Sequence, residues 1–486
     1  MSLAFRDASV AIIETSRDSV RAVLGLHELL KTPSVAGPSA PTSRAPSRGP
    51  PSDTPKVNDY LVGAQLDDAL AAGQDIVVSW PFAQGRIDDW TQAEALWKHV
   101  LFTGLGIRRA LNESPVLLTV FPGLGRDAYE RVTQLFFERL NVAGFSILER
   151  PAAQLYAANA LSGVVVDIGL AHTDVTPVID GVPQHTARTT VPIGTLHCER
   201  HLAPLLRANT SVAGGLASLS LDGPALDDAL LALARQAWTS GLVRAPGADD
   251  PAADADDEGV TDIAAVVVAG KERAVIESGL KKRATARQTA AEQARAREIE
   301  ALDLVAVPFR GAELTLGRER HRFCEPLLDA LALAALGARA AGRAPAEGGL
   351  GDDPGLAIPL PHAVAHAVGL TEVEQRQDIY AGLLVTGEIA SHVKGLGAAL
   401  QERLAPYMLG NPELAQHNDV QPRAVRLVRV PDYFAEFRER GDGLAAFLGA
   451  SIVAKVTFHD GRNFVNKTEY SERGPRAVLE MSPSLL

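Results

Sequence analysis

The sequence has little of what builds disulfide frameworks, zinc sites and membrane spans. Among its 486 residues only Cys198 and Cys324 are cysteines, so neither a disulfide framework nor a structural zinc site can be assembled, and a reducing compartment is favoured. No uninterrupted apolar run reaches the length that a membrane span needs. The first residues, MSLAFRDASV, lack the basic start and apolar core of a secretory signal. We therefore expect a cytosolic or nuclear protein.

Aromatic and basic residues are also scarce, and this excludes further classes. Aromatic residues make up 5% of the chain, and 47 basic residues face 59 acidic ones, which gives a formal net charge of −12. An acidic chain is a poor non-specific partner for nucleic acid, so a DNA contact would need a local basic segment. The 46% of hydrophobic residues and 22% of charged residues are close to the averages of folded soluble proteins, which excludes a fibre or a wholly disordered chain.

Signatures of common catalytic sites are missing as well. The sequence contains no Ser/His/Asp arrangement, no P-loop and no histidine cluster with metal-ligand spacing. His362 and His366 stand four residues apart but lack the acidic partner of an HExxH motif. We interpret these two histidines as surface or packed residues rather than as metal ligands.

What the sequence does contain is an α/β pattern that starts twice. Residues 8–24 alternate apolar and polar side chains, which predicts a β-hairpin. Val164–Asp167 then opens a second hairpin, closed near Asp180-Gly181 and returning through Thr190 and Val191. A hairpin that restarts after a run of strands and helices is typical of a duplicated α/β fold. Between the hairpins we expect strands at 76–78, 116–120 and 145–148 and helices at 87–108, 127–140 and 151–161.

Two segments differ from the rest in composition. Gly37–Lys56 is mostly Pro, Ser, Gly and Ala and cannot bury a core, so we expect a flexible loop. A charged insert at about 245–300 contains Lys271–Arg297, with eight basic and three acidic residues and no proline. This basic segment predicts an exposed helix, which is either a solvated surface or an arm that contacts DNA or a partner. Lys281–Arg283 is a weak candidate for nuclear localisation.

The turns of the two hairpins carry the residues that point to chemistry. The first turn lies within Glu14–Arg21 and the second within Asp167–Asp174. Two such turns that face each other form a phosphate clamp, because glycines let backbone N–H groups approach the phosphates and acidic residues hold the waters of Mg²⁺. The two turns are therefore the candidate functional site.

These blocks resemble actin and the actin-related proteins. The first turn takes the place of actin's first phosphate loop, DNGSGMVK, and the second takes the place of DSGDGVTH. The resemblance implies a two-lobed α/β fold of the actin/Hsp70 ATPase type, made of duplicated ribonuclease H-like domains. It places the small lobe at 1–163 and 434–486 and the large lobe at 164–433. Further matching blocks follow in the same order along nearly the whole chain: Ile87–Trp90, Leu96-Trp97, Leu155–Ala157, Asp378–Gly387, Phe447–Ala454, Glu469-Tyr470 and Gly474-Pro475.

Details of the second hairpin and of the C-terminal part indicate a subgroup. Val165–Gly169, Pro177–Asp180, Pro431–Phe434 and Gly270–Arg273 are similar to the fungal actin-related protein nine family. That family supplies nuclear subunits of chromatin remodellers of the SWI/SNF and RSC type. It binds the long helix of the Snf2-type motor ATPase together with a second actin-related protein. The resemblance therefore implies a non-catalytic scaffold that reaches chromatin indirectly and has no membrane partner.

Compared with actin, most positions that contact the phosphates are altered. Ser16 and Asp18 stand at glycine positions of the first loop, where side chains block the close approach of the backbone to phosphate. Arg21 stands at the position of the phosphate-contacting lysine, and we expect it to neutralise Asp18 internally. Arg150 falls at the catalytic glutamine, and a guanidinium neither acts as a base nor orients water as an amide does. The other vestigial positions are Glu14, Asp167, Gly169, Ala171, Asp174, Gly387 and Glu388.

We therefore expect no hydrolysis, no resident metal ion and no cofactor, with at most weak binding of ATP. Two alternatives stay open from the sequence. One is an actin-fold ATPase that acts as a nucleotide switch, and steady-state phosphate release distinguishes it from a scaffold. The other is a cytoplasmic actin-related protein in a motor-adaptor assembly.

The resemblance also implies a groove that takes amphipathic helices. Its lining falls on Tyr156, Gly181, Val453 and Val456, with Phe458 nearby. Apolar anchors of this kind bind a helix that presents side chains at i, i+4 and i+7. Ordinary core packing is the alternative for the two valines, whereas a tyrosine hydroxyl prefers a partly wet position.

Overall fold

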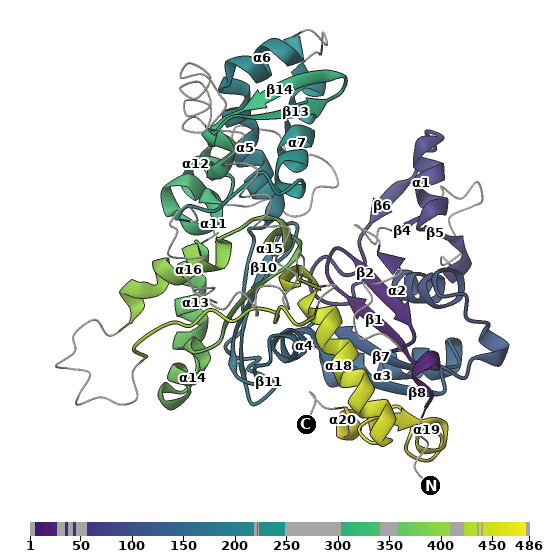
Figure 1. The fold of residues 1–486 in the computed structure, drawn as a ribbon. Helices are drawn as coiled ribbons and strands as arrows, with labels where there is room; N and C mark the ends of the chain where they lie inside the picture. Colours follow the sequence, from purple (N-terminus) through teal and green to yellow (C-terminus); the bar gives the residue numbers. More distant parts are fainter. Residues whose placement is uncertain are drawn as a thin grey trace, which may run out of the picture. The chain divides into compact units, whose positions relative to one another are not determined.

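The fold was obtained as a computed structural model. It describes residues 5–26, 35–36, 42–44, 56–217, 221, 223–247, 303–340, 358–408, 422–434, 437–438 and 441–482. The chain divides into two compact units, a first unit of Met1–Leu196, Leu327–His392 and Leu400–Leu486 and a second unit of His197–Pro326 and Val393–Ala399. Figure 1 labels their helices and strands. This division does not test the expected lobe boundaries, which stay a prediction. Most of the charged insert, with the basic segment and Lys281–Arg283, lies outside the described residues.

The first unit is built on a six-stranded sheet with the strand order β16-β8-β7-β1-β2-β3. β1 (Ala11–Thr15) pairs antiparallel with β2 (Val20–Leu24) and parallel with β7 (Pro115–Val120), which in turn pairs parallel with β8 (Gly144–Glu149). The first hairpin and the strands expected at 116–120 and 145–148 are thereby confirmed. β16 (Val465–Asn466) and β3 (Val35–Ala36) form the two edges.

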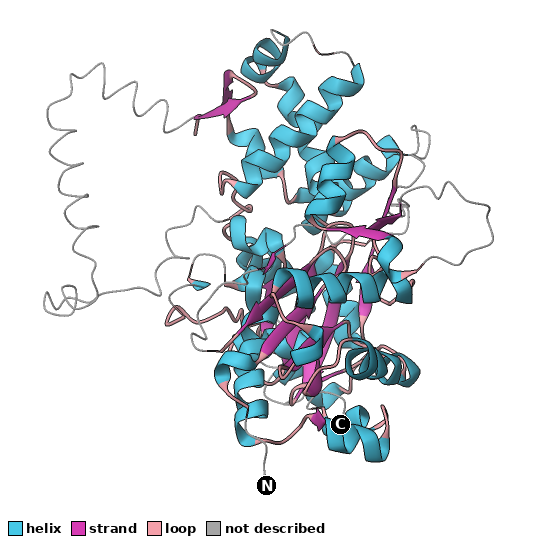
Figure 2. Cartoon of the chain, turned by 90° about the vertical axis from the view of Figure 1, so that its right-hand side faces the viewer, coloured by secondary structure: helices cyan, strands magenta, loops and turns pink. Residues whose placement is uncertain are grey.

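Helices cover both faces of this sheet, so its strands lie between helices in Figure 2. α2 (Trp90–Lys98) and α3 (Arg126–Gln134) pack on one face, and each continues into a π-helical segment, η3 (His99–Gly104) and η5 (Leu135–Arg139). These helices confirm the periodic segments expected at 87–108 and 127–140, although both are shorter. The core on this face is aromatic, with Trp97, Phe136 and Phe145 fully buried.

α4 (Arg150–Ala157) and α18 (Ala445–Asp460) pack against the opposite face. The two helices approach closely at Gly449, where an added Cβ would overlap the carbonyl group of Ala153. The helix expected at 151–161 ends four residues early. Its end is followed by Asn159, whose φ of 56° is incompatible with a continued right-handed helix.

A second sheet in the same unit has the order β11-β10-β9-β15, with β12 (Thr189–Val191) also paired to β10. β9 (Gly163–Ile168) and β10 (Thr173–Ile179) form the second hairpin, in which Asp167 lies opposite Asp174. The expected hairpin is therefore present, but it turns at residues 169–172. The turn at Asp180-Gly181 leads instead to β11 (Val182–Pro183), while β15 (Leu383–Thr386) runs parallel to β9.

A three-stranded sheet of β5 (Tyr60–Val62), β4 (Thr42–Arg44) and β6 (Val77–Ser79) adjoins α1 (Ala64–Ala71). β4 falls inside the segment expected to be a flexible loop. That expectation is wrong for these three residues, because their backbone pairs with strands on both sides. Apart from Lys56, the remainder of residues 37–56 lies outside the described part of the chain. The first unit also contains α12 (Ala330–Ala340), α13 (Leu360–Gly369), α14 (Arg376–Tyr380), α15 (Glu388–His392), α19 (Lys467–Arg473) and α20 (Ala477–Met481).

The second unit contains α6 (Thr210–Ala217), α7 (Gly223–Thr239) and the hairpin of β13 (Val305–Phe309) and β14 (Ala312–Leu316). α5 (Thr195–Ala208), α11 (Glu325–Leu328) and α16 (Leu396–Leu404) cross the division between the units. Both cysteines are buried as free thiols. None of the described helices combines the length and the apolar character that crossing a bilayer requires.

Candidate functional site

The turns of the two hairpins meet within the first unit. The main-chain N–H of Leu170, in the second turn, donates to Asp18 Oδ2, in the first turn, at 2.8 Å. Arg17, also in the first turn, donates from Nε and Nη2 to the two carboxylate oxygens of Asp174, each at 2.8 Å. The structure thus places the two predicted turns against each other, joined by charged side chains.

Arg150 joins the two sheets directly behind these turns. It stands at the start of α4 and donates from Nη1 to Glu14, at the end of β1. It also donates from Nη2 to Asp167 Oδ2 on β9, at 2.8 Å. Arg21 donates from Nη1 to both carboxylate oxygens of Glu14, each at 3.2 Å. Glu14 and Arg150 are only 1% and 7% exposed, so the pair is shielded from water.

These contacts keep the buried groups charged. Burial by itself would raise the pKa of Glu14, but Arg21 and Arg150 lower that pKa below its usual value. Burial would likewise raise the pKa of Asp174, and Arg17 instead lowers it to about 2. Asp18 differs, because burial raises its pKa more than its contacts lower it. The negative charges of Glu14 and Asp174 are therefore compensated by guanidinium groups inside the site.

Several backbone N–H groups of both turns are also occupied. Ser16 Oγ accepts hydrogen bonds from the N–H groups of Ser19, at 3.0 Å, and Asp18, at 3.4 Å. In the second turn, the N–H of Gly169 donates to the carbonyl of His172 at 2.9 Å, and the N–H of Leu170 donates to Asp18. An anion bound to such a turn would need these same donors.

One expected pair is wrong: Arg21 bonds to Glu14 and not to Asp18. The reason is the hairpin register, in which Glu14 and Arg21 lie directly opposite each other. Opposite residues of an antiparallel pair point to the same face, so the two side chains meet there. Asp18 lies in the turn, and its carboxylate accepts from the second hairpin instead.

Three residues of the site were not predicted from the sequence. Arg17 is the main partner of Asp174, and Arg188 adds a contact of 3.3 Å to the same carboxylate. Gln154 Nε2 donates to Asp167 Oδ2 at 2.9 Å. Gln154 follows Arg150 by four residues on α4, so helical spacing was a signal that it shares the same face. Nothing in the local sequence indicates the partner of Arg17, which lies 157 residues away.

A nucleoside triphosphate with its metal ion does not fit this arrangement. Such a ligand needs free N–H donors, free cationic groups and carboxylates open to metal-bound water. Side chains of the two turns already accept from the N–H groups of Asp18, Ser19 and Leu170. The guanidinium groups of Arg17, Arg21 and Arg150 are paired with carboxylates. Among the described residues no group of three or more His, Cys, Asp or Glu side chains is placed to hold a metal ion.

Ala171 is buried in the second turn, and Gly387 and Glu388 lie where β15 meets α15. Gly387 has a φ of 103°, and an added Cβ would overlap the carbonyl of Ile168, so only glycine fits this approach to β9. Glu388 is exposed. The resemblance assigns this segment to adenosine, and the structure shows it packed tightly against the second hairpin.

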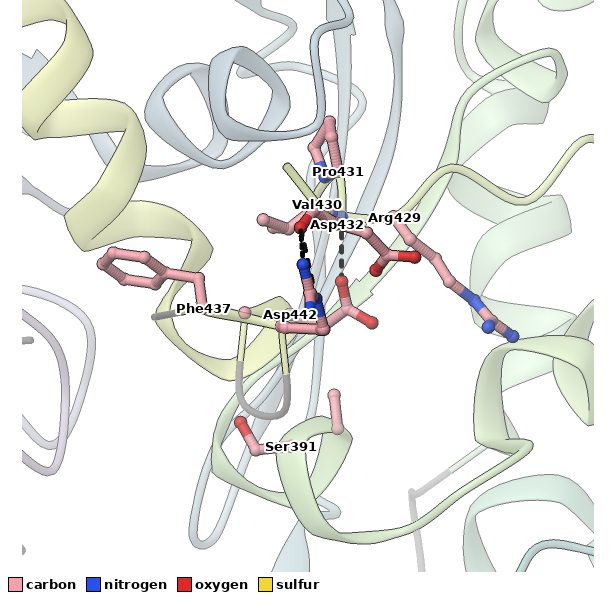
Figure 3. A pocket seen from close by; sticks show the side chains of 10 residues that line it. Ser391, Arg429, Val430, Pro431, Asp432, Phe437 and Asp442 are labelled. Carbon is pink, nitrogen blue, oxygen red and sulfur yellow. Dashed lines mark hydrogen bonds between the residues drawn. The ribbon is translucent and has the colours of Figure 1, made fainter. Parts of the chain in front are cut away.

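A cavity of about 350 Å³ opens beside α15 (Figure 3). Its polar groups are largely bound to the chain itself: the N–H of Val430 donates to Asp442 Oδ1 at 3.0 Å, and Arg438 Nη2 donates to the carbonyl of Asp432 at 3.2 Å. The lining carries both signs of charge and does not single out one class of ligand. It consists of Ala390, Ser391, Arg429, Val430, Pro431, Asp432, Phe437, Arg438, Gly441 and Asp442.

The residues expected to line the groove differ in their exposure to solvent. Tyr156 and Val453 are half-buried at the border of the core between α4 and α18, and Val456 is 58% exposed. Gly181 is buried with a φ of 81°, and an added Cβ would overlap the hydroxyl of Tyr156. Phe458 does not line a surface, because it is buried.

The environment of Phe458 explains this correction. Its ring packs edge-on against Phe5, with centroids 6.1 Å apart, and lies 5.3 Å from the ring of Phe464. Helical spacing turns it towards the sheet, whereas Val456, two residues earlier, points away from it. Core packing therefore explains Phe458, and the exposed Val456 is left as the apolar surface residue of this helix.

Comparisons with known proteins point to one family. The actin family model matches residues 34–214. The chain is 24% identical to the SWI/SNF and RSC complexes subunit arp9 of Schizosaccharomyces pombe, over 98% of this chain and 99% of that protein. Shorter matches join it to actin-related protein 7 of Arabidopsis thaliana (34% identical, 27% of this chain and 36% of the relative) and of Oryza sativa subsp. indica (34%, 27% and 37%). The resemblance to the actin-related proteins and the actin-type α/β fold are thereby confirmed.

Proposed function

We propose that this chain is a non-catalytic scaffold subunit of a chromatin-remodelling complex. The premise is that it has an actin-type fold and resembles the arp9 subunit along nearly its whole length. The complex is nuclear, ATP-dependent and of the SWI/SNF or RSC type. The observation that carries this proposal is the closed cluster of ion pairs at the two turns. It supports a fold whose role is to bind partners.

The absence of catalysis is proposed from the chemistry of that cluster. Hydrolysis needs a group that orients or deprotonates water beside a bound phosphate. Arg150 is held between Glu14 and Asp167, and those contacts raise its pKa against the effect of burial, so it stays protonated. A guanidinium in this state is neither a base nor an acceptor for water. ATP turnover therefore belongs to another subunit of the complex.

The scaffold role is proposed from the surface of α18. Val456 is exposed, and Val453, one turn earlier on the same helix, is half-buried. Apolar side chains at this spacing, beside the half-buried Tyr156, suit a helix-in-groove contact. The partner that fits the resemblance is the long helix of a Snf2-type motor ATPase, which a second actin-related protein would bind alongside this chain.

Affinity purification of the full-length protein from nuclear extract tests the proposal. We expect a Snf2-type motor and a second actin-related protein to be recovered in amounts close to equimolar with the tagged chain. A second purification from cytoplasmic extract serves as the control. Recovery of motor-adaptor proteins from the cytoplasm, with no Snf2-type motor in either extract, would contradict the proposal.

Steady-state phosphate release separates the scaffold from the nucleotide switch. The isolated chain is expected to release no phosphate above the rate of a blank without protein. Because a contaminating ATPase would also give a signal, the same assay is run on the charge-matched variant Arg86→Lys, whose side chain is exposed and 72% accessible. Turnover that follows the intact chain through purification would support the switch instead.

A further inference from the structure

A further charged contact joins the two sheets of the first unit, outside the two turns. Glu149, the last residue of β8, is fully buried. Its Oε2 lies 3.5 Å from Nε2 of His185, which stands between β11 and β12 of the second sheet. The side chain of His185 is 46% exposed, so solvent protons reach one member of the pair while the other member is buried.

Two connecting segments meet at this contact. They are the loop 121–125, between β7 and α3, and the segment 184–188, between β11 and β12. The N–H of Gly123 donates to Glu149 Oε1 at 2.9 Å, and a Cβ added to Gly123 would lie 3.5 Å from Nδ1 of His185. Arg188 Nη1 donates to the carbonyl of Pro122 at 2.6 Å. The segment 184–188 is therefore packed on the loop 121–125.

The groups that face the Glu149 carboxyl decide what a change of pH does to it. They are Tyr129 from α3, and His185 and Arg188 from the segment 184–188. Tyr129 donates its hydroxyl to Oε1 at 2.6 Å, and burial raises the pKa of Tyr129, so the hydroxyl keeps its proton. The guanidinium of Arg188 stays charged and is shared with Asp174, at 3.3 Å. Histidine is the side chain that ordinarily changes charge between pH 5 and pH 8, so the positive charge that pH can remove belongs to His185.

The carboxyl itself is sensitive to that charge. Burial raises the pKa of Glu149, and His185 is the strongest of the groups that lower it. A carboxyl whose pKa is raised by folding stabilises the protein below its unfolded pKa, and this contribution is lost as pH rises through the folded pKa. An acid and a base in contact titrate as a pair. When the last proton leaves the pair, a buried carboxylate remains without the histidine charge.

We propose that Glu149 and His185 form a pH-sensitive latch, which holds the loop 121–125 against the segment 184–188 while the pair keeps one proton and loosens when that proton is lost. The latch is closed at mildly acidic pH and opens as pH rises above neutrality. Asp174, with a pKa of about 2, does not change its charge in this range, so its pair with Arg17 stays closed. This inference concerns the isolated chain and does not depend on membership of a complex.

The test is His185→Gln in the full-length protein, compared with the unaltered protein from about pH 5.5 to about pH 8.5. Hydrogen exchange is followed by mass spectrometry in peptides that cover residues 121–129 and 184–190. The ratio of the exchange rates of the two proteins is taken at each pH, because the intrinsic pH dependence of exchange then cancels. At the acidic end we expect these peptides to exchange about threefold faster or more in the variant, since the latch is missing. At the alkaline end the ratio is expected to approach one, because both proteins then lack the histidine charge.

Two further variants make the result specific. Glu149→Gln removes the buried charge and keeps an acceptor for the N–H of Gly123. In that background, adding His185→Gln is expected to change exchange equally at every pH. His366→Gln replaces an exposed histidine on α13 and is expected to leave both peptides unchanged.

Three outcomes overturn the proposal. They are a ratio for His185→Gln that stays constant over the pH range, a ratio that grows as pH rises, and a pH-dependent ratio that persists after Glu149 is also replaced. If Glu149→Gln does not fold, His185→Gln decides alone. Its side chain is half-exposed, and the proposal requires its ratio to fall with rising pH.

Discussion

The turn cluster and the exposed face of α18 are opposite in character, although both belong to the first unit. At the turns, Arg17 is buried, Asp174 is only 17% exposed, and both are satisfied by contacts within the chain. On α18, Val456 is 58% exposed and Val453 is half-buried, so apolar surface is left open to water. The charged side chains at the turns are paired within the chain, whereas the apolar side chains on α18 are available for contact with a partner.

This difference indicates which of the two surfaces of this actin-type fold is better suited to bind a partner. Charged groups that are paired and buried gain little from an external ligand, because the ligand would have to displace existing contacts. Exposed apolar side chains on a helix gain from any partner that covers them. The site that the sequence first points to is therefore closed, and the surface on α18 is the better candidate for binding.

The largest expected effect is that of Arg17→Ala. The substitution removes two contacts to Asp174 and one, of 2.9 Å, to the carbonyl of Ala83. Breaking a buried pair in this way is expected to reduce the free energy of unfolding by about 3 to 5 kcal/mol. Urea denaturation followed by fluorescence measures it.

Arg86→Ala is the matched control for that measurement. Arg86 is paired with Asp88 at 2.6 Å, but the two side chains are 72% and 37% exposed. We expect a change of about 1 kcal/mol or less. Equal losses for Arg17→Ala and Arg86→Ala would show that burial of the turn cluster contributes nothing, and the comparison above would no longer hold.

The pH dependence sharpens the same comparison. The pKa of Asp174 is lowered to about 2 by Arg17 and its other partners, against the effect of burial. A group whose pKa is depressed by folding stabilises the protein above its unfolded pKa, near 4, and loses that contribution as pH falls towards 2. The contribution lost is about 2 kcal/mol.

The measurement is the difference in unfolding midpoint between the unaltered protein and Arg17→Ala as a function of pH. Glu149 and Asp442 have raised pKa values and oppose the trend, but both proteins share them. The pKa of Asp18 is also raised by burial and is lowered in part by Arg17, so Asp18 contributes to the difference as well. The difference in unfolding midpoint is expected to shrink between pH 5 and pH 2. A difference that stays constant over this range would exclude Asp174 as the group responsible.

The smallest expected effect is on binding. Val456→Asp places a charge on the exposed face of α18 and is expected to weaken capture of the long helix of a Snf2-type motor by about tenfold. Val77→Asp is the control, because Val77 is 78% exposed and lies on β6, outside this helix. A folded Val456→Asp protein that captures the motor helix as well as Val77→Asp does would contradict the groove.

The fold was predictable where apolar pattern and burial coincide. The run at 116–120 becomes β7, all of whose residues are buried, and the alternation at 8–24 becomes the first hairpin. The end of α4 was missed because Ala158, Ala160 and Leu161 are good helix formers and mask the stop signal of Asn159. There the left-handed backbone at Asn159 ends the helix.

The site was predictable in its members but not in its pairing. Glu14 and Asp167 came from matching loop positions and Arg150 from its distance to the matching block Leu155–Ala157, and the structure brings the three together. The pairing of Arg21 with Asp18 failed because it followed proximity in sequence, whereas the register of the hairpin puts Arg21 opposite Glu14. Arg17 was missed because its partner lies on another sheet, a contact that only the tertiary fold creates.

Isothermal titration of the full-length protein with ATP and MgCl₂ tests the central claim most directly. The account predicts no saturable heat at micromolar protein, because the donors and cations of the two turns are already engaged. Saturable binding with a dissociation constant in the low micromolar range would contradict it.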